Sequence, residues 1–352
     1  MTLTLSTGPS TDVDGPLPGP LTHSEMQTFR TCRRRWHWAY RDRYSEKPGT
    51  QPATGVAQLG TNIHACLEGH YTGLDAFDVL AVIYDDLQDR RPEDHHAIAS
   101  ERSYAFTMVK GYLEWVAETG VDAQYGVVAT EADTRAKIWL YPEDGGGDAD
   151  VTITLRGKLD QVVERRDGSG ARLVRDFKTV GTLSKADDLV RDTQMRTYDL
   201  LHWMSQPHKA IVDGVLYTML LRSKRTAKAT PPFYAAVHMG YNTRDRQSAL
   251  EAVRGTALDI MAVDARLAAG EPPQRVLYAN PGAYCAWACP FVSVCHMADD
   301  GSRLADALED GFVRADPWDH YGTERMDSIR RALGGTVKDV GNDPVKEGTA
   351  GG

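Results

Sequence analysis

The segment of residues 157–178 reads GKLDQVVERRDGSGARLVRDFK and combines two strand-like runs with a glycine-rich turn between them. Side chains two residues apart on a strand point to the same face of a sheet. Asp176 and Lys178 are therefore predicted to share one face, while Phe177 turns to the opposite face and into the core. The segment predicts a hairpin that places a carboxylate and an ammonium group side by side.

Asp160 joins this pair only if the hairpin register has the matching parity, because a slip of one residue moves a side chain to the other face. An odd-length loop such as Gly168-Ser169-Gly170 predicts that Asp160 lies opposite Lys178 and Val162 opposite Asp176. Such a cluster supplies oxygen ligands for Mg²⁺ or Mn²⁺ and a cation beside the attacking water, as metal-assisted phosphodiester hydrolysis requires. A solvated Asp–Lys salt bridge is the alternative interpretation.

The hydrophobic period changes along the chain. Helical spacing runs through residues 24–40, 57–72, 75–90 and 97–119. Strand-like patterns follow over 125–140, 151–165 and 171–180, then a helix over 184–203, strands over 213–221 and 233–241, and a helix over 243–269. This order indicates an α/β fold with a helical N-terminal elaboration.

The two ends of the chain lack this periodicity. Residues 1–20 are rich in Thr, Ser, Gly and Pro, and the polar segment 316–352 ends in two glycines. We expect both segments to be loose, disordered tails on either side of one domain over residues 21–315. Residues 142–148 include three consecutive glycines and predict a surface loop within that domain.

The cysteines form a second pattern. Cys285, Cys289 and Cys295 fall within eleven residues, and Cys32 lies far upstream. An odd total of five cysteines, in a chain without a secretory signal pattern, favours a metal site over a disulfide framework. Four thiolates hold either zinc or an iron-sulfur cluster, and coincidental buried cysteines are the alternative.

Two helical segments carry further candidate side chains. Gln194 and Tyr198 lie four residues apart and share one helix face, as ordinary surface and core residues also do. His64 lies on an earlier predicted helix that also presents Glu68. A neutral imidazole binds Mn²⁺ well, although a buried histidine without a metal is the commoner case.

In this order the motifs resemble the RecB-like branch of the PD-(D/E)XK nuclease superfamily. The resemblance is to the AddB-type iron-sulfur nucleases and to the single-domain exonucleases of CRISPR loci and phages. It covers most of the chain, through the helix with Cys32, residues 60–64, 157–160, 176–178 and 194–198, and the three C-terminal cysteines. It departs at one point, because three residues separate Cys285 from Cys289 where the family usually has two.

The resemblance implies a mixed central sheet flanked by helices, followed by a C-terminal cysteine-rich segment. It implies that Mg²⁺ or Mn²⁺ is bound by His64, Asp160, Asp176 and the backbone carbonyl of Phe177. Glu68 is a less favoured extra ligand.

The resemblance also assigns Lys178 a catalytic role and gives Gln194 and Tyr198 the role of orienting the substrate or the residues around it. A structural 4Fe-4S cluster would tie the N- and C-terminal segments together, with zinc as the alternative. Its ligands would be Cys32, Cys285, Cys289 and Cys295.

The implied activity is metal-dependent exonucleolytic hydrolysis of single-stranded or resected DNA ends, in recombination, repair or phage DNA processing. The alternatives are a non-catalytic DNA-binding recombination partner and a CRISPR adaptation nuclease that trims ends before integration. Recombination or replication proteins are the expected partners. The chain lacks the phosphate-binding motif Gly-x-x-x-x-Gly-Lys-[Ser/Thr], so we expect no nucleotide cofactor.

Composition limits the remaining possibilities. The chain has 352 residues, of which 41% are hydrophobic and 25% charged, as in ordinary globular proteins. Its formal net charge of -9 argues against coating nucleic acid by overall positive charge, although it permits a local basic groove. No apolar run approaches ~18 residues, so we expect a cytoplasmic protein without a membrane partner.

Two local basic clusters are candidate phosphate contacts, with a solvated charged face as the alternative. They are residues 33–35 and the set Arg222, Lys224, Arg225 and Lys228. Trp36, Trp38 and Tyr40 are candidates for stacking on unpaired bases. Inward packing is the favoured interpretation of Trp36 and Tyr40, because they lie four residues apart.

Overall fold

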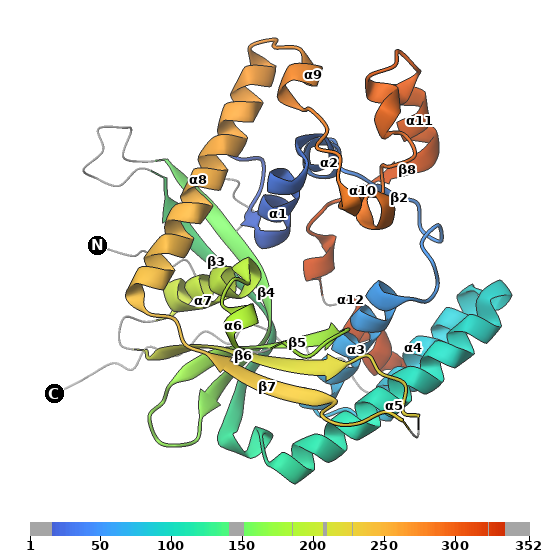
Figure 1. Ribbon diagram of the computed structural model, residues 1–352, viewed down its shortest axis with the longest axis vertical. Helices are drawn as coiled ribbons and strands as arrows, with labels where there is room; N and C mark the ends of the chain where they lie inside the picture. Colours follow the sequence, from blue (N-terminus) through green and yellow to red (C-terminus); the bar gives the residue numbers. More distant parts are fainter. Residues whose placement is uncertain are drawn as a thin grey trace.

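The structure is a computed structural model, which describes residues 16–140, 151–184, 186–206, 210–226, 228–322 and 324–334. The predicted loop over 142–148 and most of the two predicted tails lie outside these residues. Figure 1 shows a twisted sheet with helices on both faces, and residues 273–314 lie beside residues 23–46 at one end.

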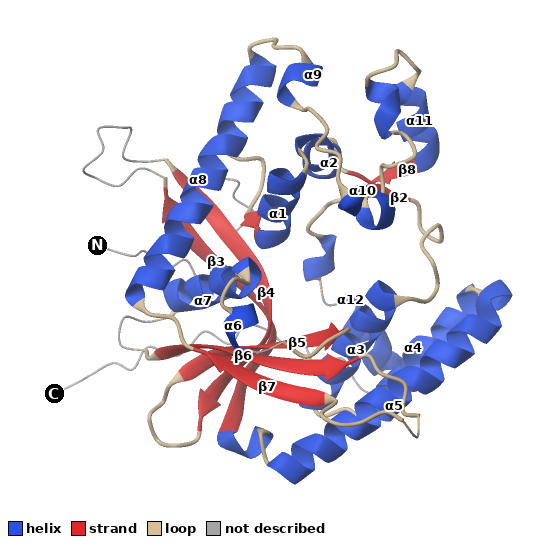
Figure 2. Ribbon diagram, in the orientation of Figure 1, coloured by secondary structure: helices blue, strands red, loops and turns tan. Residues whose placement is uncertain are grey.

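One mixed sheet forms the centre of the fold (Figure 2). It contains β1 (Leu21–Thr22), β3 (Tyr125–Trp139), β4 (Thr152–Arg165), β5 (Arg172–Val180), β6 (Val212–Leu221) and β7 (Tyr234–Met239). β3 and β5 pair antiparallel with β4, and β7 pairs antiparallel with β6. β5 and β6 are parallel, as are β1 and β4. The predicted α/β class with a mixed sheet is confirmed.

β4 has different neighbours along its two edges. One edge pairs with β3 over nearly its whole length. The other edge pairs with β1 at Leu155 and Arg156 and then with β5 from Gln161 to Glu164. The pairing of β4 with β5 thus starts at Gln161, directly after Asp160, while β5 continues beside β6 through Val180. Asp160 therefore lies where β4 and β5 diverge.

The hairpin register differs from the prediction by two residues. Gln161 pairs with Arg175, which places Asp160 opposite Asp176 and not opposite Lys178. The turn has five residues, 166–170, because Arg165 donates to the carbonyl of Ala171 and Arg166 donates to Gln124 outside the hairpin. The loop is still odd in length, so the predicted parity holds and both aspartates face the same side.

The helices follow the predicted segments with two breaks. They are α1 (His23–Thr31), α2 (Arg33–Trp36), α3 (Val56–Tyr71), α4 (Ala76–Arg90), α5 (His95–Thr119), α6 (Ala186–Leu189), α7 (Thr193–Ser205), α8 (Thr243–Ala268), α9 (Pro273–Val276), α10 (Ala283–Ala288), α11 (Leu304–Gly311) and α12 (Glu324–Ala332), with a π-helical turn η1 (His37–Arg41). The first helix breaks at Cys32, whose backbone is extended with φ -160°. The helix predicted over 184–203 is divided because Asp192 caps a new helix, accepting hydrogen bonds from the backbone of Gln194 and Met195.

The two faces of the sheet are covered by different helices. α3, α4 and α5 contribute to one core cluster, in which Phe177 and Leu220 from the sheet are buried. α7 packs on the opposite face, where Val174 and Met219 contact the cluster around Met195. α8 lies against α7 (Figure 1). Phe177 thus faces away from Asp176 and Lys178, as the strand period predicts.

The N- and C-terminal segments meet away from the centre of the sheet. β2 (Tyr44–Glu46) pairs antiparallel with β8 (Phe312–Arg314), and the rings of Trp38 and Phe291 pack with centroids 5.3 Å apart. Residues beyond 316, expected to form a loose tail, include α12. Met326 and Ile329 of that helix are buried in the same core cluster as α3 and α4. In the described ranges, no helix combines the length and the apolar character needed to cross a membrane.

Candidate active site

Asp160, Asp176 and Lys178 meet at the point where β4 and β5 diverge. Asp160 accepts a hydrogen bond of 2.9 Å from the backbone nitrogen of Phe177, so its carboxylate replaces a strand-to-strand contact. The Lys178 Nζ lies 3.0 Å from Oδ2 of Asp176. The three side chains therefore form one cluster on the α7 side of the sheet.

Helix α7 adds the two candidates from the predicted Gln-x-x-x-Tyr pattern. Lys178 donates a hydrogen bond of 3.0 Å to Oε1 of Gln194, whose Nε2 donates to the hydroxyl of Tyr198 at 3.2 Å. Asp192 fixes the start of this helix by accepting from the backbone of Gln194. The cap therefore sets the position of Gln194 beside Lys178.

The Gly157 position explains how α7 comes so close to β4. A Cβ atom there would lie 2.8 Å from Cδ2 of Leu201 and 3.1 Å from Cε1 of Tyr198. Both side chains belong to α7. A glycine is needed because the helix packs directly on the strand backbone three residues before Asp160.

His64 reaches the cluster from α3. Its Nδ1 lies 3.3 Å from Oδ2 of Asp160. Burial alone would lower the pKa of His64, but the Asp160 carboxylate outweighs this and raises the pKa to about 9. Burial opposes this pairing, but His64 still holds the pKa of the Asp160 carboxyl below its usual value.

The second carboxylate behaves differently. The side chain of Asp176 is 2% exposed, and burial followed by repulsion from Asp160 raises its pKa to about 6, although Lys178 opposes the shift. Burial would lower the pKa of Lys178, but Asp176 and Asp160 reverse this and raise it above its usual value. The ammonium group of Lys178 is therefore retained at neutral pH.

The donor set fits a hard divalent cation. Two carboxylates and an imidazole lie together, and the buried Oδ2 of Asp176 lies 3.0 Å from the Lys178 ammonium without hydrogen-bond geometry. Oxygen and imidazole ligands suit Mg²⁺ and Mn²⁺. As they stand, no three His, Cys, Asp or Glu side chains in the described part of the chain are arranged to hold a metal. His64 and Lys178 pair with the two carboxylates instead.

Sequence reasoning missed Glu131, which belongs to β3. The β3–β4 register places it opposite Asp160, and its carboxylate forms a 2.8 Å ion pair with Lys158. Its backbone has a positive φ of 52°, unusual for a residue with a side chain. Burial and the charge of Asp160 raise its pKa. No local pattern marks this residue, because its proximity to Asp160 depends on strand pairing.

Glu68, the less favoured extra ligand, lies one turn after His64 on α3. Burial, followed by the charge of Glu131, raises its pKa to about 7. The neighbouring α12 borders this region, since Arg325 donates to Oδ1 of Asn62 at 2.8 Å. Residues expected to be a tail thus contribute to the surroundings of the site.

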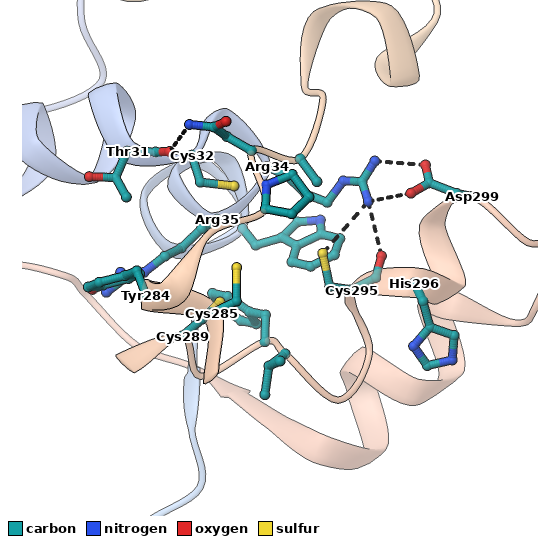
Figure 3. Close-up of a pocket in the computed structure, with 16 residues that line it drawn as sticks. Thr31, Cys32, Arg34, Arg35, Tyr284, Cys285, Cys289, Cys295, His296 and Asp299 are labelled. Atoms are coloured by element: carbon teal, nitrogen blue, oxygen red, sulfur yellow. Dashed lines mark hydrogen bonds and ion pairs between the residues drawn. The ribbon is translucent and has the colours of Figure 1, made fainter. Parts of the chain in front are cut away.

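The four cysteines of the second pattern line one cavity of about 300 Å³. Figure 3 shows Cys32 on one side and Cys285, Cys289 and Cys295 on the other, with their sulfur atoms directed into the space between the segments. Burial raises the pKa of the Cys289 thiol. The remaining cysteine, Cys66, is fully buried on α3. The chain thus brings together thiols that are more than two hundred residues apart in sequence.

The predicted basic clusters are only partly available to a ligand. Arg34 is buried, pairs with Asp299 at 2.7 Å and donates to the carbonyl of Cys295 (Figure 3). Arg225 lies 3.4 Å from the ring centre of Phe233 and is packed against it. Trp36 and Trp38 are buried, so neither ring is free to stack on a base.

The family profile that this chain matches agrees with this architecture. Residues 20–296 match the profile described as PD-(D/E)XK nuclease superfamily. A search of curated proteins finds no match. Among solved structures, one titled "Crystal structure of SSO0001" is similar over 67% of this chain and 94% of its own, with 12% sequence identity and a TM-score of 0.29. That TM-score supports no conclusion about this chain.

The mixed sheet brings two aspartates and a lysine together where β4 and β5 diverge. The profile match spans most of the chain, and the chain belongs to the PD-(D/E)XK nuclease superfamily. Its α/β architecture is the fold of that superfamily.

Proposed function

We propose that this protein is a Mg²⁺- or Mn²⁺-dependent DNA exonuclease that hydrolyses phosphodiester bonds at single-stranded or resected DNA ends. The observation that carries the proposal is the convergence of Asp160, Asp176 and Lys178 where β4 and β5 diverge. Membership of a nuclease superfamily supports the same chemistry. The processes served are recombination, repair or phage DNA processing.

His64, Asp160, Asp176 and the carbonyl of Phe177 would hold the divalent ion, which supplies Lewis acidity toward the phosphate and an activated water. Lys178 carries its positive charge at neutral pH because two carboxylates raise its pKa. Its ammonium group stabilises negative charge developing on the phosphate. The Oε1 of Gln194 positions Lys178 by accepting its hydrogen bond, and the Tyr198 hydroxyl positions Gln194 by accepting a hydrogen bond from Nε2.

The cysteine cavity is proposed to hold a structural 4Fe-4S cluster through Cys32, Cys285, Cys289 and Cys295. Four thiols around one cavity are a suitable donor set for it. Zinc is the alternative occupant, since it also accepts four thiolates. Iron, sulfide and zinc analysis of anaerobically purified protein separates the two, because the cluster requires iron and acid-labile sulfide in equal amounts.

The proposed setting is the cytoplasm, with recombination or replication proteins as partners and no nucleotide cofactor. Arg33 and Arg35 are partly exposed basic residues that remain available for DNA phosphates. Because the chain as a whole is negatively charged and repels DNA, we expect DNA to contact it only at such local basic positions.

The exonuclease proposal is tested with linear single-stranded DNA labelled at its 5′ or 3′ end and with circular single-stranded DNA of equal length. We expect degradation of the linear DNA with Mg²⁺ or Mn²⁺, none with EDTA, and an intact circle. Cutting of the circle would show an endonuclease. Intact linear DNA in the presence of either metal would contradict nuclease function.

A further inference from the structure

Helix α10 and the segment before it carry an exposed aromatic surface. Trp287 is 75% exposed and Tyr278 is 48% exposed, although both are large side chains that gain by burial. Tyr284 lies beside Trp287, with ring centroids 5.2 Å apart in an edge-on arrangement. Neither of the two most exposed rings belongs to a core cluster of the described residues.

Two arginines from α2 lie against these rings. The Arg33 guanidinium is 5.2 Å from the ring centre of Tyr278, and the Arg35 guanidinium is 4.5 Å from that of Tyr284. We call the five residues the stacking face, which consists of Arg33, Arg35, Tyr278, Tyr284 and Trp287. Cations and rings therefore adjoin one another on one surface.

Arg33 and Arg35 of the stacking face differ in burial and ion pairing from Arg34, which lies between them in the sequence. Arg34 is buried and pairs with Asp299. Within the described ranges, no carboxylate forms an ion pair with Arg33 or Arg35. Their charges are thus available to an anionic ligand, and the exposed ring of Trp287 beside them is available to a flat one.

An unpaired nucleic-acid strand is both anionic, through its phosphates, and flat, through its exposed bases. Aromatic side chains stack on exposed base faces, and arginines contact the phosphates between the bases. In a duplex the base faces are covered by neighbouring base pairs, so stacking favours single strands. Charge complementarity and exposed rings together select this ligand over an uncharged partner.

We propose that the stacking face binds unpaired bases of single-stranded DNA and that the cysteine site holds the two halves of this face together. The proposal rests on the proposed function and adds the surface that would select single strands. Arg35 and Tyr284 line the same cavity as the four cysteines (Figure 3). Cys32 belongs to the α2 side and Cys285 to α10, so a group bound by both thiols would fix Arg33 and Arg35 against the rings.

The test separates base stacking from phosphate binding and from cleavage. Fluorescence anisotropy in EDTA measures binding of full-length protein to labelled oligo(dT), to an abasic oligonucleotide of equal length and to a blunt duplex. The variants are Trp287→Ala, Trp287→Phe and Tyr278→Ala. Trp139→Ala is the matched control, because Trp139 is 40% exposed at the end of β3, outside the stacking face.

We expect wild type to bind oligo(dT) more tightly than the abasic strand or the duplex. Trp287→Ala should weaken oligo(dT) binding about tenfold and leave abasic binding unchanged, since one stacked base is lost. Trp287→Phe should retain most of the affinity, Tyr278→Ala should reduce it, and Trp139→Ala should match wild type. Iron and zinc content measured in parallel shows that the cysteine site is intact.

Equal binding of oligo(dT) by wild type and Trp287→Ala, with the same result for Tyr278→Ala, would overturn the inference. So would equal loss of abasic and oligo(dT) binding, because that pattern reports phosphate contacts alone. If wild type degrades linear DNA with Mg²⁺ while these variants bind normally, the nuclease proposal stands and the stacking face fails. If wild type neither cleaves nor binds DNA, the proposed nuclease function itself is contradicted.

Discussion

The Lys178 Nζ lies 3.0 Å from Oδ2 of Asp176 and 3.0 Å from Oε1 of Gln194. These two partners come from different elements, since Asp176 belongs to β5 and Gln194 to the first turn of α7. The ammonium group is therefore held between the sheet and the helix. The position of the helix cap thereby determines the position of the proposed catalytic cation.

Replacing Gln194 should test this positioning. Gln194→Ala removes an acceptor from Lys178 and a donor to Tyr198, so we expect kcat to fall by roughly tenfold or more with little change in KM. Gln194→Glu keeps an acceptor for Lys178 and should retain more activity than alanine. Steady-state kinetics on single-stranded DNA provides the measurement, and an unchanged kcat for Gln194→Ala would exclude a positioning role.

Gly157→Ala should be destabilising and should lower activity. The new methyl group would press on Leu201 and Tyr198, so we expect a loss of about 1–3 kcal/mol in the free energy of unfolding. Urea denaturation measures it. Gly255→Ala is the matched control on α8, where a Cβ meets no atom within 4 Å, and should stabilise the protein by up to about 1 kcal/mol. Equal stability of the two variants would contradict the close packing of α7 on β4.

Cys289→Ser should abolish binding of the proposed cluster or metal and lower the melting temperature. The substitution removes one of the four thiols around the cavity, and with it a ligand of the proposed link between the N- and C-terminal segments. Cys66→Ser is the matched control, because Cys66 is buried on α3 and outside that cavity. Elemental analysis and thermal denaturation distinguish the two variants. Identical iron and zinc content in both would show that Cys289 holds no metal.

His202 should make the protein less stable in mild acid. Burial, reinforced by Arg172 and Arg246, lowers its pKa to about 4, while the side chain is 1% exposed. The unfolded chain binds the extra proton at higher pH than the folded chain, so stability falls as the pH drops from 6.5 toward 4. For His202 alone the loss between pH 7 and pH 5 is about 2 kcal/mol.

Urea denaturation of wild type and His202→Gln at both pH values isolates this contribution. The variant should lose about 2 kcal/mol less than wild type between pH 7 and pH 5, because glutamine does not titrate. Equal losses of stability in the two proteins would show that the pKa of His202 is the same in the folded and the unfolded chain, which would contradict the prediction. Comparing the difference between the two proteins removes the effect of the other titrating groups.

Features set by local periodicity could be predicted from the sequence. The strand period places Asp176 and Lys178 on one face and Phe177 on the other, and the odd turn length gives Asp160 the right parity. The register itself could not be predicted. Arg166 leaves the hairpin to donate to the carbonyl of Gln124, which lengthens the turn through a contact outside the hairpin.

Features that depend on distant pairing escaped prediction. Glu131 lies opposite Asp160 only because β3 pairs with β4, and the intervening loop gives no sign of that register. Helix α12 is mostly polar, and only Met326 and Ile329 are buried, so its sequence resembles a tail. The exposure of Trp287 likewise depends on how α10 packs, whereas the more suggestive Trp36 and Trp38 are buried.

The most direct test of the account is cleavage of end-labelled single-stranded DNA with Mg²⁺ or Mn²⁺ by wild type, Lys178→Ala and Lys110→Ala. Lys110 is an exposed lysine on α5 and serves as the matched control. We predict that Lys178→Ala loses at least about a hundredfold in rate while binding DNA as wild type does, and that Lys110→Ala is unaffected. Cleavage by Lys178→Ala at the wild-type rate would contradict the central role of Lys178 in catalysis.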